Sequence, residues 1–235
     1  MTATGGGQDT LAEAGRLAEL LPPGAVLAAL AGPGERLPLP PAEAARAARL
    51  PPGRAAQFAA GRWCAHRALE RLGCPEDDIG TGYRGEPRWP DGYRGSITHK
   101  PGGAVAVAAP APAAIGVDLE DAGPLPSAVR RLVLLPAEPD LPPGFPVPGV
   151  VAERIVFSAK EAYYKWHGQH DETRRPGFAD VRIRLQADGR LRASPVPGTG
   201  LPAALGGWVC GPRWIVTAIW SVPPPGDSLH PLSLV

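Results

Sequence analysis

Apolar residues that recur at steps of three and four positions predict two long helices in this chain. Residues 55–72 carry such a repeat around Trp63, and Gly73 follows as the kind of residue that ends a helix. Residues 151–167 carry the second repeat. These two segments are the clearest helices that the sequence predicts.

Shorter helices and a set of strands complete the pattern. Two segments rich in Ala, Glu, Arg and Leu, each followed by proline, predict helices at residues 11–21 and 41–50. Short apolar runs predict strands at residues 25–30, 95–98, 104–109, 115–120 and 181–185. Residues 208–220 alternate in a way that predicts a final hairpin around Gly211 and Pro212. Each half of the chain therefore runs from helices into strands, although no sequence repeat proves a duplication.

Prolines and glycines mark long connections between these elements. The chain has 30 glycines and 31 prolines, and many of them lie in residues 121–149 around a short apolar run at 129–135. We interpret this segment as a connection that carries one helix, and such segments are often functional. The tail from residue 223 is predicted to be flexible.

Composition and charge exclude several classes of protein. With 235 residues the chain can bury a substantial core as one large domain or two small ones. Its 24 basic and 23 acidic residues leave a formal charge of +1, which disfavours a nucleic-acid binder. Three cysteines without a CxxC spacing suggest neither disulfides nor zinc, and they fit a reducing cytoplasm. No signal peptide is evident, and the apolar stretch at 25–31 is too short to span a bilayer, so a soluble protein is expected.

Lysine is scarce, and its placement suggests chemistry. Only three of the 24 basic residues are lysines, and Lys160 and Lys165 flank the acid Glu161 within residues 157–166. A lysine ammonium is a compact charge with three donors, which suits phosphate oxygens. Biased genome composition would explain the scarcity, and an ordinary i,i+4 ion pair would explain Glu161 with Lys165. Neither explains why two of the three lysines lie together.

Two acids, Asp118 and Glu120, are separated by one residue in a predicted strand. That spacing directs both side chains to one face, roughly 7 Å apart along the backbone. Such a pair can hold a magnesium ion, whose remaining ligands are phosphate oxygens and water. An edge strand with two solvated acids is the alternative, because so short a motif often matches by accident.

Basic groups upstream are candidates for binding an anion. Arg54 and Arg62 are eight residues apart, about two helical turns, so both can face one anion. His99 follows a predicted strand and can donate to a phosphate. Solvated arginines and a structural histidine are the alternatives for these residues individually.

Taken together, these motifs resemble one family. In chain order they are Arg54, Phe58 and residues 61–65, then Gly85-Glu86-Pro87 with residues 89–92, then Gly95-Ser96-Ile97-Thr98-His99, Gly116-Val117-Asp118-Leu119-Glu120, and Phe157-Ser158-Ala159-Lys160-Glu161-Ala162-Tyr163-Tyr164-Lys165. Over roughly residues 54–220 the chain resembles the 4′-phosphopantetheinyl transferases of the larger, surfactin-synthetase-activating and enterobactin-synthetase type. The occurrence of all these motifs in the same order is far more specific than a match to any single motif.

The resemblance implies an α+β fold, a pseudodimer of two similar α+β halves with the active cleft between them. The N-terminal half would span residues 1–110 and contact the adenosine phosphates of coenzyme A. The C-terminal half would span residues 111–222 and carry the metal and catalytic motifs, with a flexible tail at 223–235. Because one chain supplies both halves, a monomer is expected.

The resemblance also implies the reaction and its residues. The family moves the 4′-phosphopantetheine arm of coenzyme A onto a serine of an apo acyl or peptidyl carrier protein, releases adenosine 3′,5′-bisphosphate and requires Mg²⁺. Asp118, Glu120 and Glu161 would hold the metal. Arg54, Arg62, Arg84 and His99 would bind the adenosine 3′-phosphate and neighbouring groups, and Lys160 and Lys165 the pyrophosphate and pantetheine phosphate. Glu161, Lys165 and Asp118 would be catalytic, with Glu161 activating the serine directly or through metal-bound water.

The chain departs from the family pattern at Ala55, Gln57 and Ala152-Glu153, and these departures bear on how the cofactor is held.

Expected partners are carrier domains of polyketide, nonribosomal peptide or fatty-acid synthases, and residues 121–149 are the segment expected to contact them. Two alternatives remain at this stage. One is a metal-dependent hydrolase of coenzyme A or a related nucleotide, and the other is a noncatalytic coenzyme A-binding protein.

Overall fold

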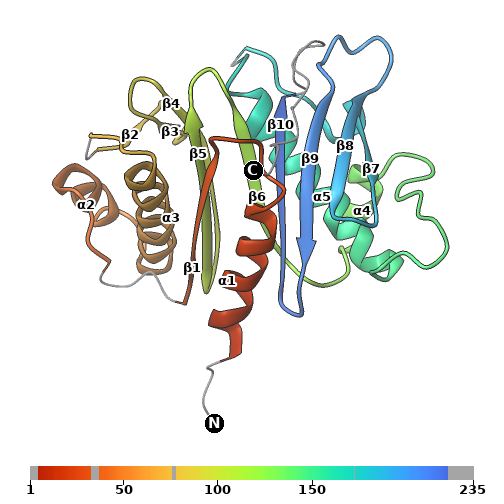
Figure 1. The fold of residues 1–235 in the computed structure, drawn as a ribbon, viewed down its shortest axis with the longest axis horizontal. Coiled ribbons are helices and arrows are strands. Elements are labelled where there is room, and N and C mark those ends of the chain that lie inside the picture. Colours follow the sequence, from red (N-terminus) through yellow and green to blue (C-terminus); the bar gives the residue numbers. More distant parts are fainter. Residues whose placement is uncertain (1–4, 33–36, 76–77, 172, 222–235) are drawn as a thin grey trace, which may run out of the picture.

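The described residues form two larger antiparallel sheets, each with a long helix packed against it, and a third sheet of two short strands (Figure 1). The computed structural model describes residues 5–32, 37–75, 78–171 and 173–221, so the predicted tail from residue 223 lies outside the described residues. Within the described residues, no helix combines the length and apolar character that crossing a membrane requires. The three cysteines are free thiols, as the sequence predicted.

The two long helices are α3 (Pro52–Arg71) and α5 (Gly149–His167), close to the predicted segments. Helix α3 begins three residues earlier than expected, at Pro52. Proline is favourable in the first turn of a helix, because the N–H groups there form no hydrogen bonds within the helix and the N–H that proline lacks is not needed. Gly73 follows α3 with a φ of 73°, a left-handed conformation that glycine adopts without steric cost.

Three shorter helices occupy the predicted regions with different ends. They are α1 (Gly5–Ala18), α2 (Pro41–Ala47) and α4 (Ser127–Val133). Helix α1 contacts strands of both sheets and lies in front of the junction between them (Figure 1). Helix α4 confirms that the proline-rich connection after residue 121 carries one helix.

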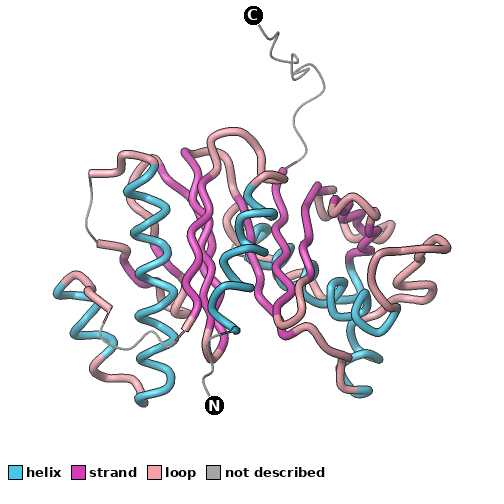
Figure 2. Tube along the Cα trace, turned by 60° about the horizontal axis from the view of Figure 1, so that its bottom comes forward, coloured by secondary structure: helices cyan, strands magenta, loops and turns pink. Residues whose placement is uncertain are grey.

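The first sheet has the order β1-β5-β4 and lies against α3. Its strands are β1 (Val26–Ala31), β4 (Tyr93–Lys100) and β5 (Gly103–Pro110), all antiparallel. The central strand β5 is buried on both faces: Ala104, Ala106 and Ala108 pack toward α3, and Val105 and Val107 join the core on the other side. Figure 2 shows the strands in the middle of the molecule with α3 beside them.

The second sheet has the order β6-β10-β9-β8-β7 and lies against α5. Its strands are β6 (Ile115–Asp121), β7 (Val181–Leu185), β8 (Arg190–Pro195), β9 (Ala204–Cys210) and β10 (Trp214–Ser221), and the short helix η1 (Phe178–Asp180) precedes β7. Strands β9 and β10 are the predicted final hairpin. The sequence missed β8, in which arginines alternate with small and apolar residues, and the two-residue strands β2 (Gly80–Thr81) and β3 (Pro87–Arg88).

Alternation along β6 places the acids on one side of the second sheet. Val117 and Leu119 point into the core shared with the first sheet, so Asp118 and Glu120 point the opposite way, toward α5. Helix α5 lies directly on this strand at Gly116, where an added Cβ would lie 2.0 Å from the carbonyl oxygen of Ala162. The close contact brings the side chains of α5 to the two acids.

Candidate active site

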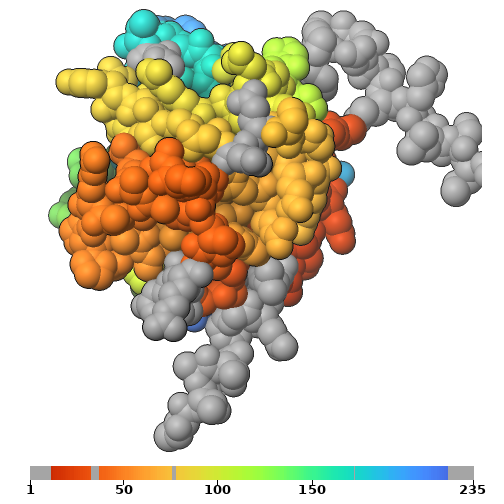
Figure 3. Space-filling view, turned by 90° about the vertical axis from the view of Figure 1, so that its left-hand side faces the viewer, coloured from red at the N-terminus to blue at the C-terminus, as the bar shows by residue number. Residues whose placement is uncertain are grey.

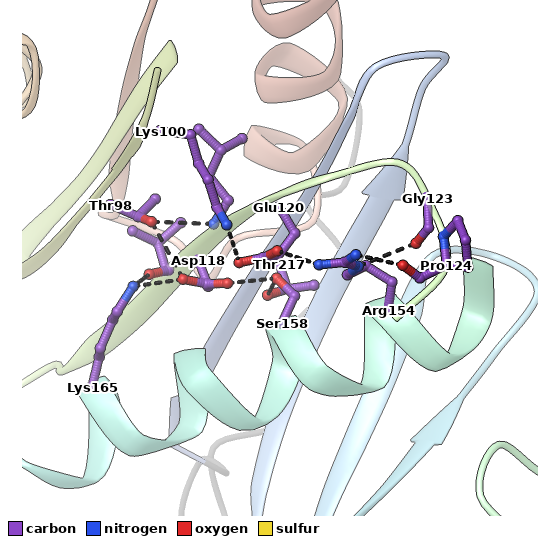
Figure 4. A network of polar contacts seen from close by, with 12 residues as sticks. Thr98, Lys100, Asp118, Glu120, Gly123, Pro124, Arg154, Ser158, Lys165 and Thr217 are labelled. Carbon is purple, nitrogen blue, oxygen red and sulfur yellow. Dashed lines mark hydrogen bonds and ion pairs between the residues drawn. The ribbon is translucent and has the colours of Figure 1, made fainter. Parts of the chain in front are cut away.

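Asp118 is the centre of a polar network between β6 and α5 (Figure 4). Its carboxylate lies 2.7 Å from Nζ of Lys165 and accepts a hydrogen bond of 2.9 Å from Oγ of Ser158, and both residues belong to α5. Thr98 of β4 donates to the same carboxylate over 3.3 Å. Although Asp118 is only 5% exposed, its charge is therefore compensated and hydrogen-bonded.

Glu120 lies two residues further along β6 and is equally buried. Lys100, the last residue of β4, lies 2.7 Å from one of its oxygens, and Arg154 of α5 lies 3.0 Å from the other. Arg154 also donates to the carbonyl oxygens of Gly123 and Pro124, which begin the connection after β6 (Figure 4). Glu120 thus joins the first sheet, α5 and this connection.

Glu161 of α5 is the third acid of this cluster. Burial raises the pKa of its carboxyl above the ordinary value, and the negative charge of Asp118 raises it further. The charge of Lys165 opposes that rise, and smaller effects come from Glu120 and Lys100. The three acids, drawn from two distant segments, are therefore close enough to affect one another. A carboxylate with a raised pKa is a better proton acceptor than an ordinary one.

The donor set of this cluster fits a divalent cation. Three carboxylates offer the hard oxygen ligands that magnesium prefers. Among the described residues, however, no group of three or more His, Cys, Asp or Glu side chains stands ready to hold a metal ion. Asp118 and Glu120 instead face lysine ammonium groups, so a cation would compete with Lys165 and Lys100 for the same oxygens.

His99 lies between the acidic cluster and α3. An added Cβ at Gly61 of α3 would lie 3.3 Å from the His99 ring, so the helix packs closely on it. Burial lowers the pKa of His99 to about 4, and the positive charges of Arg54 and, less strongly, Lys165 add to this effect. The imidazole is therefore neutral near pH 7. Its buried Nδ1 has no hydrogen-bond partner among the described residues, which is unusual for a buried polar atom.

Arg62, which the resemblance assigns to the adenosine 3′-phosphate and neighbouring groups, is buried and bonded within the protein. Its side chain is 4% exposed, and the guanidinium donates to the carbonyl oxygens of Ile79 and Gly80 and to Oγ1 of Thr81. It also lies 3.7 Å from the buried carboxylate of Glu43. Through these contacts Arg62 connects α3 to the residues at the start of β2.

Lys160 is not part of the acidic cluster either. Its ammonium is 1% exposed and contacts Glu138 and two carbonyl oxygens on a different face of α5. The physical reason is the helical step: Lys160 and Glu161 are neighbours in sequence but about 100° apart around the helix axis. One of the two faces β6, and the other faces the connection before α5.

Arg84 lies in the exposed turn between β2 and β3, where its backbone N–H donates to the Glu86 carboxylate over 2.9 Å. Its neighbour Tyr83 is 99% exposed. Figure 3 shows this region of residues 80–95 in yellow, above the orange surface of α2 and the start of α3. Arg84 is therefore exposed on the surface of the protein.

Sequence reasoning missed Lys100, Arg154 and the hydroxyls of Thr98 and Ser158. The scarcity of lysine was a usable signal, because Lys100 is the one lysine besides Lys160 and Lys165 and directly follows His99. Its pairing with Glu120 depends on β4 lying beside β6, which the sequence does not reveal.

Two family models match this chain. Residues 42–109 match the model of the 4′-phosphopantetheinyl transferase N-terminal domain, and residues 114–211 match that of the 4′-phosphopantetheinyl transferase superfamily. The two matched ranges meet between β5 and β6. Together they include the three acids, Lys100, Lys165 and His99.

Several curated proteins are similar over most of the chain. The 4′-phosphopantetheinyl transferase Svp of Streptomyces mobaraensis is 38% identical over 202 residues, which cover 80% of this chain and 80% of the relative. The 4′-phosphopantetheinyl transferase PptT of Mycobacterium tuberculosis is 37% identical over 194 residues, or 76% of this chain and 84% of the relative. Enterobactin synthase component D of Salmonella austin is 34% identical over 133 residues, about half of each chain (55% and 54%).

Proposed function

This chain belongs to the 4′-phosphopantetheinyl transferases, and we propose that its acidic cluster is where the phosphopantetheine arm of coenzyme A passes to a serine of an apo carrier protein. The observation that carries this proposal is the meeting of three acids with two of the three lysines, which come from β4, β6 and α5. Family membership makes the chain an enzyme, a transferase that acts on carrier proteins.

In the reaction, the serine oxygen forms a bond to the phosphorus that carries the pantetheine arm. The bond from that phosphorus to the bridging oxygen of the diphosphate breaks, and adenosine 3′,5′-bisphosphate leaves. Glu161 accepts the serine proton, and its raised pKa suits that role. Little else is required of the protein, because phosphoryl transfer depends mainly on positioning and charge neutralisation.

Asp118, Glu120 and Glu161 would hold the divalent metal that the family typically uses, and we propose Mg²⁺. When bound, this ion neutralises charge on the diphosphate. Lys165 and Lys100 are the chain's own positive groups for the same purpose. Each now lies 2.7 Å from a carboxylate oxygen, so each is held within the cluster.

For the nucleotide end of coenzyme A we propose Arg54, His99 and Arg84. Arg54 and His99 are coupled through the effect of the arginine charge on the imidazole pKa. A neutral imidazole still carries one N–H that can donate to a phosphate oxygen. We leave Arg62 and Lys160 out of this set, because both side chains are buried and form hydrogen bonds inside the protein.

The two sheets, each with its long helix, support the interpretation of the chain as two halves, residues 1–110 and 111–222, that work as one monomer. The carrier protein is proposed to meet the connection at 121–149. Its helix α4 carries Arg130 and Arg131 and exposes Leu132, whose side chain is 74% accessible. This surface begins at Gly123 and Pro124, which Arg154 ties to the acidic cluster.

The decisive experiment is mass spectrometry of a panel of apo carrier proteins incubated with coenzyme A, Mg²⁺ and the enzyme. The expected result is a carrier heavier by one phosphopantetheine, together with adenosine 3′,5′-bisphosphate. Cleavage of coenzyme A without a modified carrier would identify a hydrolase instead. Tight binding of coenzyme A with neither product would identify a noncatalytic binding protein.

A further inference from the structure

Lys160 lies in the motif that carries Glu161 and Lys165, yet its ammonium is bound entirely within the protein. Its Nζ lies 2.7 Å from Oε2 of Glu138, 2.7 Å from the carbonyl oxygen of Val133 and 2.9 Å from that of Phe178. An ammonium has three donors, and these three acceptors use them all. Burial lowers the pKa of Lys160, whereas the hydrogen bond and charge of Glu138 raise it.

Glu138 is the partner that makes this arrangement more than a chance contact. The same carboxylate accepts hydrogen bonds from the backbone N–H groups of Leu135, over 2.8 Å, and of Ile183 in β7, over 2.7 Å. Its side chain is 1% exposed, as is that of Lys160. The preceding residue, Ala137, has a φ of 63°, so the chain makes a tight turn here. The pair therefore ties the end of α4 and this turn to both α5 and β7.

The connection is also fixed at its other end. Arg154 of α5 donates to the carbonyl oxygens of Gly123 and Pro124, and Arg130 of α4 pairs with Glu153 of α5 over 2.8 Å. Arg182 also donates to the carbonyl oxygen of Pro136 and so supports the turn from the surface. Among the anchors that the structure describes, the Lys160–Glu138 pair is the fully buried one.

We propose that Lys160 is a positioning residue that, together with Glu138, holds residues 122–148 in place for the carrier protein and makes no contact with coenzyme A. This inference rests on the proposed function, in which that connection meets the carrier. It gives the lysine of the motif a role distinct from that of Lys165, although both lie on α5. The helix thus serves the acidic cluster with one face and the connection with another.

The test begins with Lys160→Met, which leaves the buried Glu138 carboxylate without its counter-charge. We expect the KM for the carrier protein to rise about tenfold or more. The KM for coenzyme A should stay within about twofold of the wild-type value, as should its Kd from calorimetry. A loss of coenzyme A binding comparable to the loss for the carrier would overturn the proposal, because it would make Lys160 a cofactor ligand.

A double variant further separates a positioning role of Lys160 from a role as a ligand of coenzyme A. In Lys160→Met with Glu138→Gln, the uncompensated charge is gone, while an amide oxygen remains to accept the N–H of Ile183. The carrier KM should return to within about threefold of the wild type. A phosphate ligand would not be restored by a change at Glu138, so failure of this rescue would count against the proposal.

A structural readout keeps the inference testable even if no carrier is modified. Hydrogen exchange of peptides from residues 127–145 should accelerate in Lys160→Met, while exchange in β9 and β10 stays at the wild-type rate. Unchanged exchange in 127–145 would refute the anchoring role independently of the proposed activity. If Lys160→Met does not fold, Arg182→Ala tests the same turn from the surface. The Arg182→Ala variant should raise the KM for the carrier about twofold to threefold without changing the KM for coenzyme A. An unchanged carrier KM would contradict the anchoring role of this turn.

Discussion

The ammonium of Lys165 lies 2.7 Å from Oδ1 of Asp118, so a residue of α5 and a residue of β6 neutralise one another at the centre of the site (Figure 4). This pair is 28% and 8% exposed at its two side chains, which is more open than the buried Lys160–Glu138 pair on the other side of the helix. A ligand can therefore reach Lys165 but not Lys160. The same helix therefore combines an accessible lysine with an enclosed one.

Asp118→Asn should lower the rate of transfer about a hundredfold or more, the usual cost of removing one electrostatic group from an active site. The amide keeps the shape of the side chain and can still accept from Ser158, but it removes the charge that holds Lys165 and would hold the cation. The measurement is kcat from mass spectrometry of the modified carrier. Asp121→Asn is the matched control, because Asp121 ends the same strand but is exposed. Equal activity in the two variants would contradict the site assignment.

Lys100→Met should lower kcat/KM for coenzyme A about tenfold or more, because a hydrogen bond to a charged group is worth about 1.5–3 kcal/mol. Its ammonium lies 2.7 Å from Glu120 and is 30% exposed, so it can serve both the acid and a diphosphate. Lys100→Arg keeps the positive charge and should retain most of the activity. Steady-state kinetics at varied coenzyme A would show this, and a fully active methionine variant would remove Lys100 from the site.

His99 should make the folded protein sensitive to mild acid. Its pKa is about 4 in the folded state and near 6.5 in an unfolded chain, so the unfolded state binds the proton more readily. The stability that the neutral ring contributes is thus complete above pH 6.5 and is lost as the pH falls toward 4. The loss should be on the order of 2 kcal/mol in the free energy of unfolding.

The measurement for His99 is urea unfolding between pH 7 and pH 4.5, compared with the variant His99→Gln. Other groups titrate in both proteins, so the difference between the two curves isolates His99. The wild type should lose more stability than the variant over this range. Parallel curves would show that the ring is not held neutral by its surroundings.

The sequence predicted those parts of the fold and site that depend on local periodicity. The helices around Trp63 and Lys165 follow from steps of three and four, and the position of Asp118 and Glu120 on one face follows from the alternation of a strand. Strand β8 was missed because its alternating arginines give it a weak apolar pattern.

What could not be predicted depends on which segments pack together. The local sequence does not show which of Lys160 and Lys165 faces the acids of β6. That depends on which face of α5 packs against β6 and which packs against Glu138. Arg62 looked exposed in a polar position of α3, but Ile79 and Gly80 cover it. Lys100 reaches Glu120 only because β4 and β6, from the two sheets, lie side by side.

Gly116→Ala should damage both stability and activity, because α5 leaves no room for a side chain at this position of β6. The added Cβ would lie 2.0 Å from the carbonyl oxygen of Ala162 and 2.7 Å from the backbone nitrogen of Trp166, and backbone atoms cannot rotate away. The helix would have to shift away from the strand. We expect the free energy of unfolding to fall by about 2 kcal/mol or more.

The same shift would move Lys165 and Glu161 relative to Asp118, so transfer activity should fall further than the loss of folded protein explains. The matched control is Gly149→Ala at the start of α5, where an added Cβ meets nothing within 4 Å and alanine is the better helix former. The measurements are the thermal unfolding of both variants and their kcat per amount of folded protein. If Gly116→Ala is as stable and active as Gly149→Ala, close packing of α5 on β6 is not what positions the acids and lysine of the site.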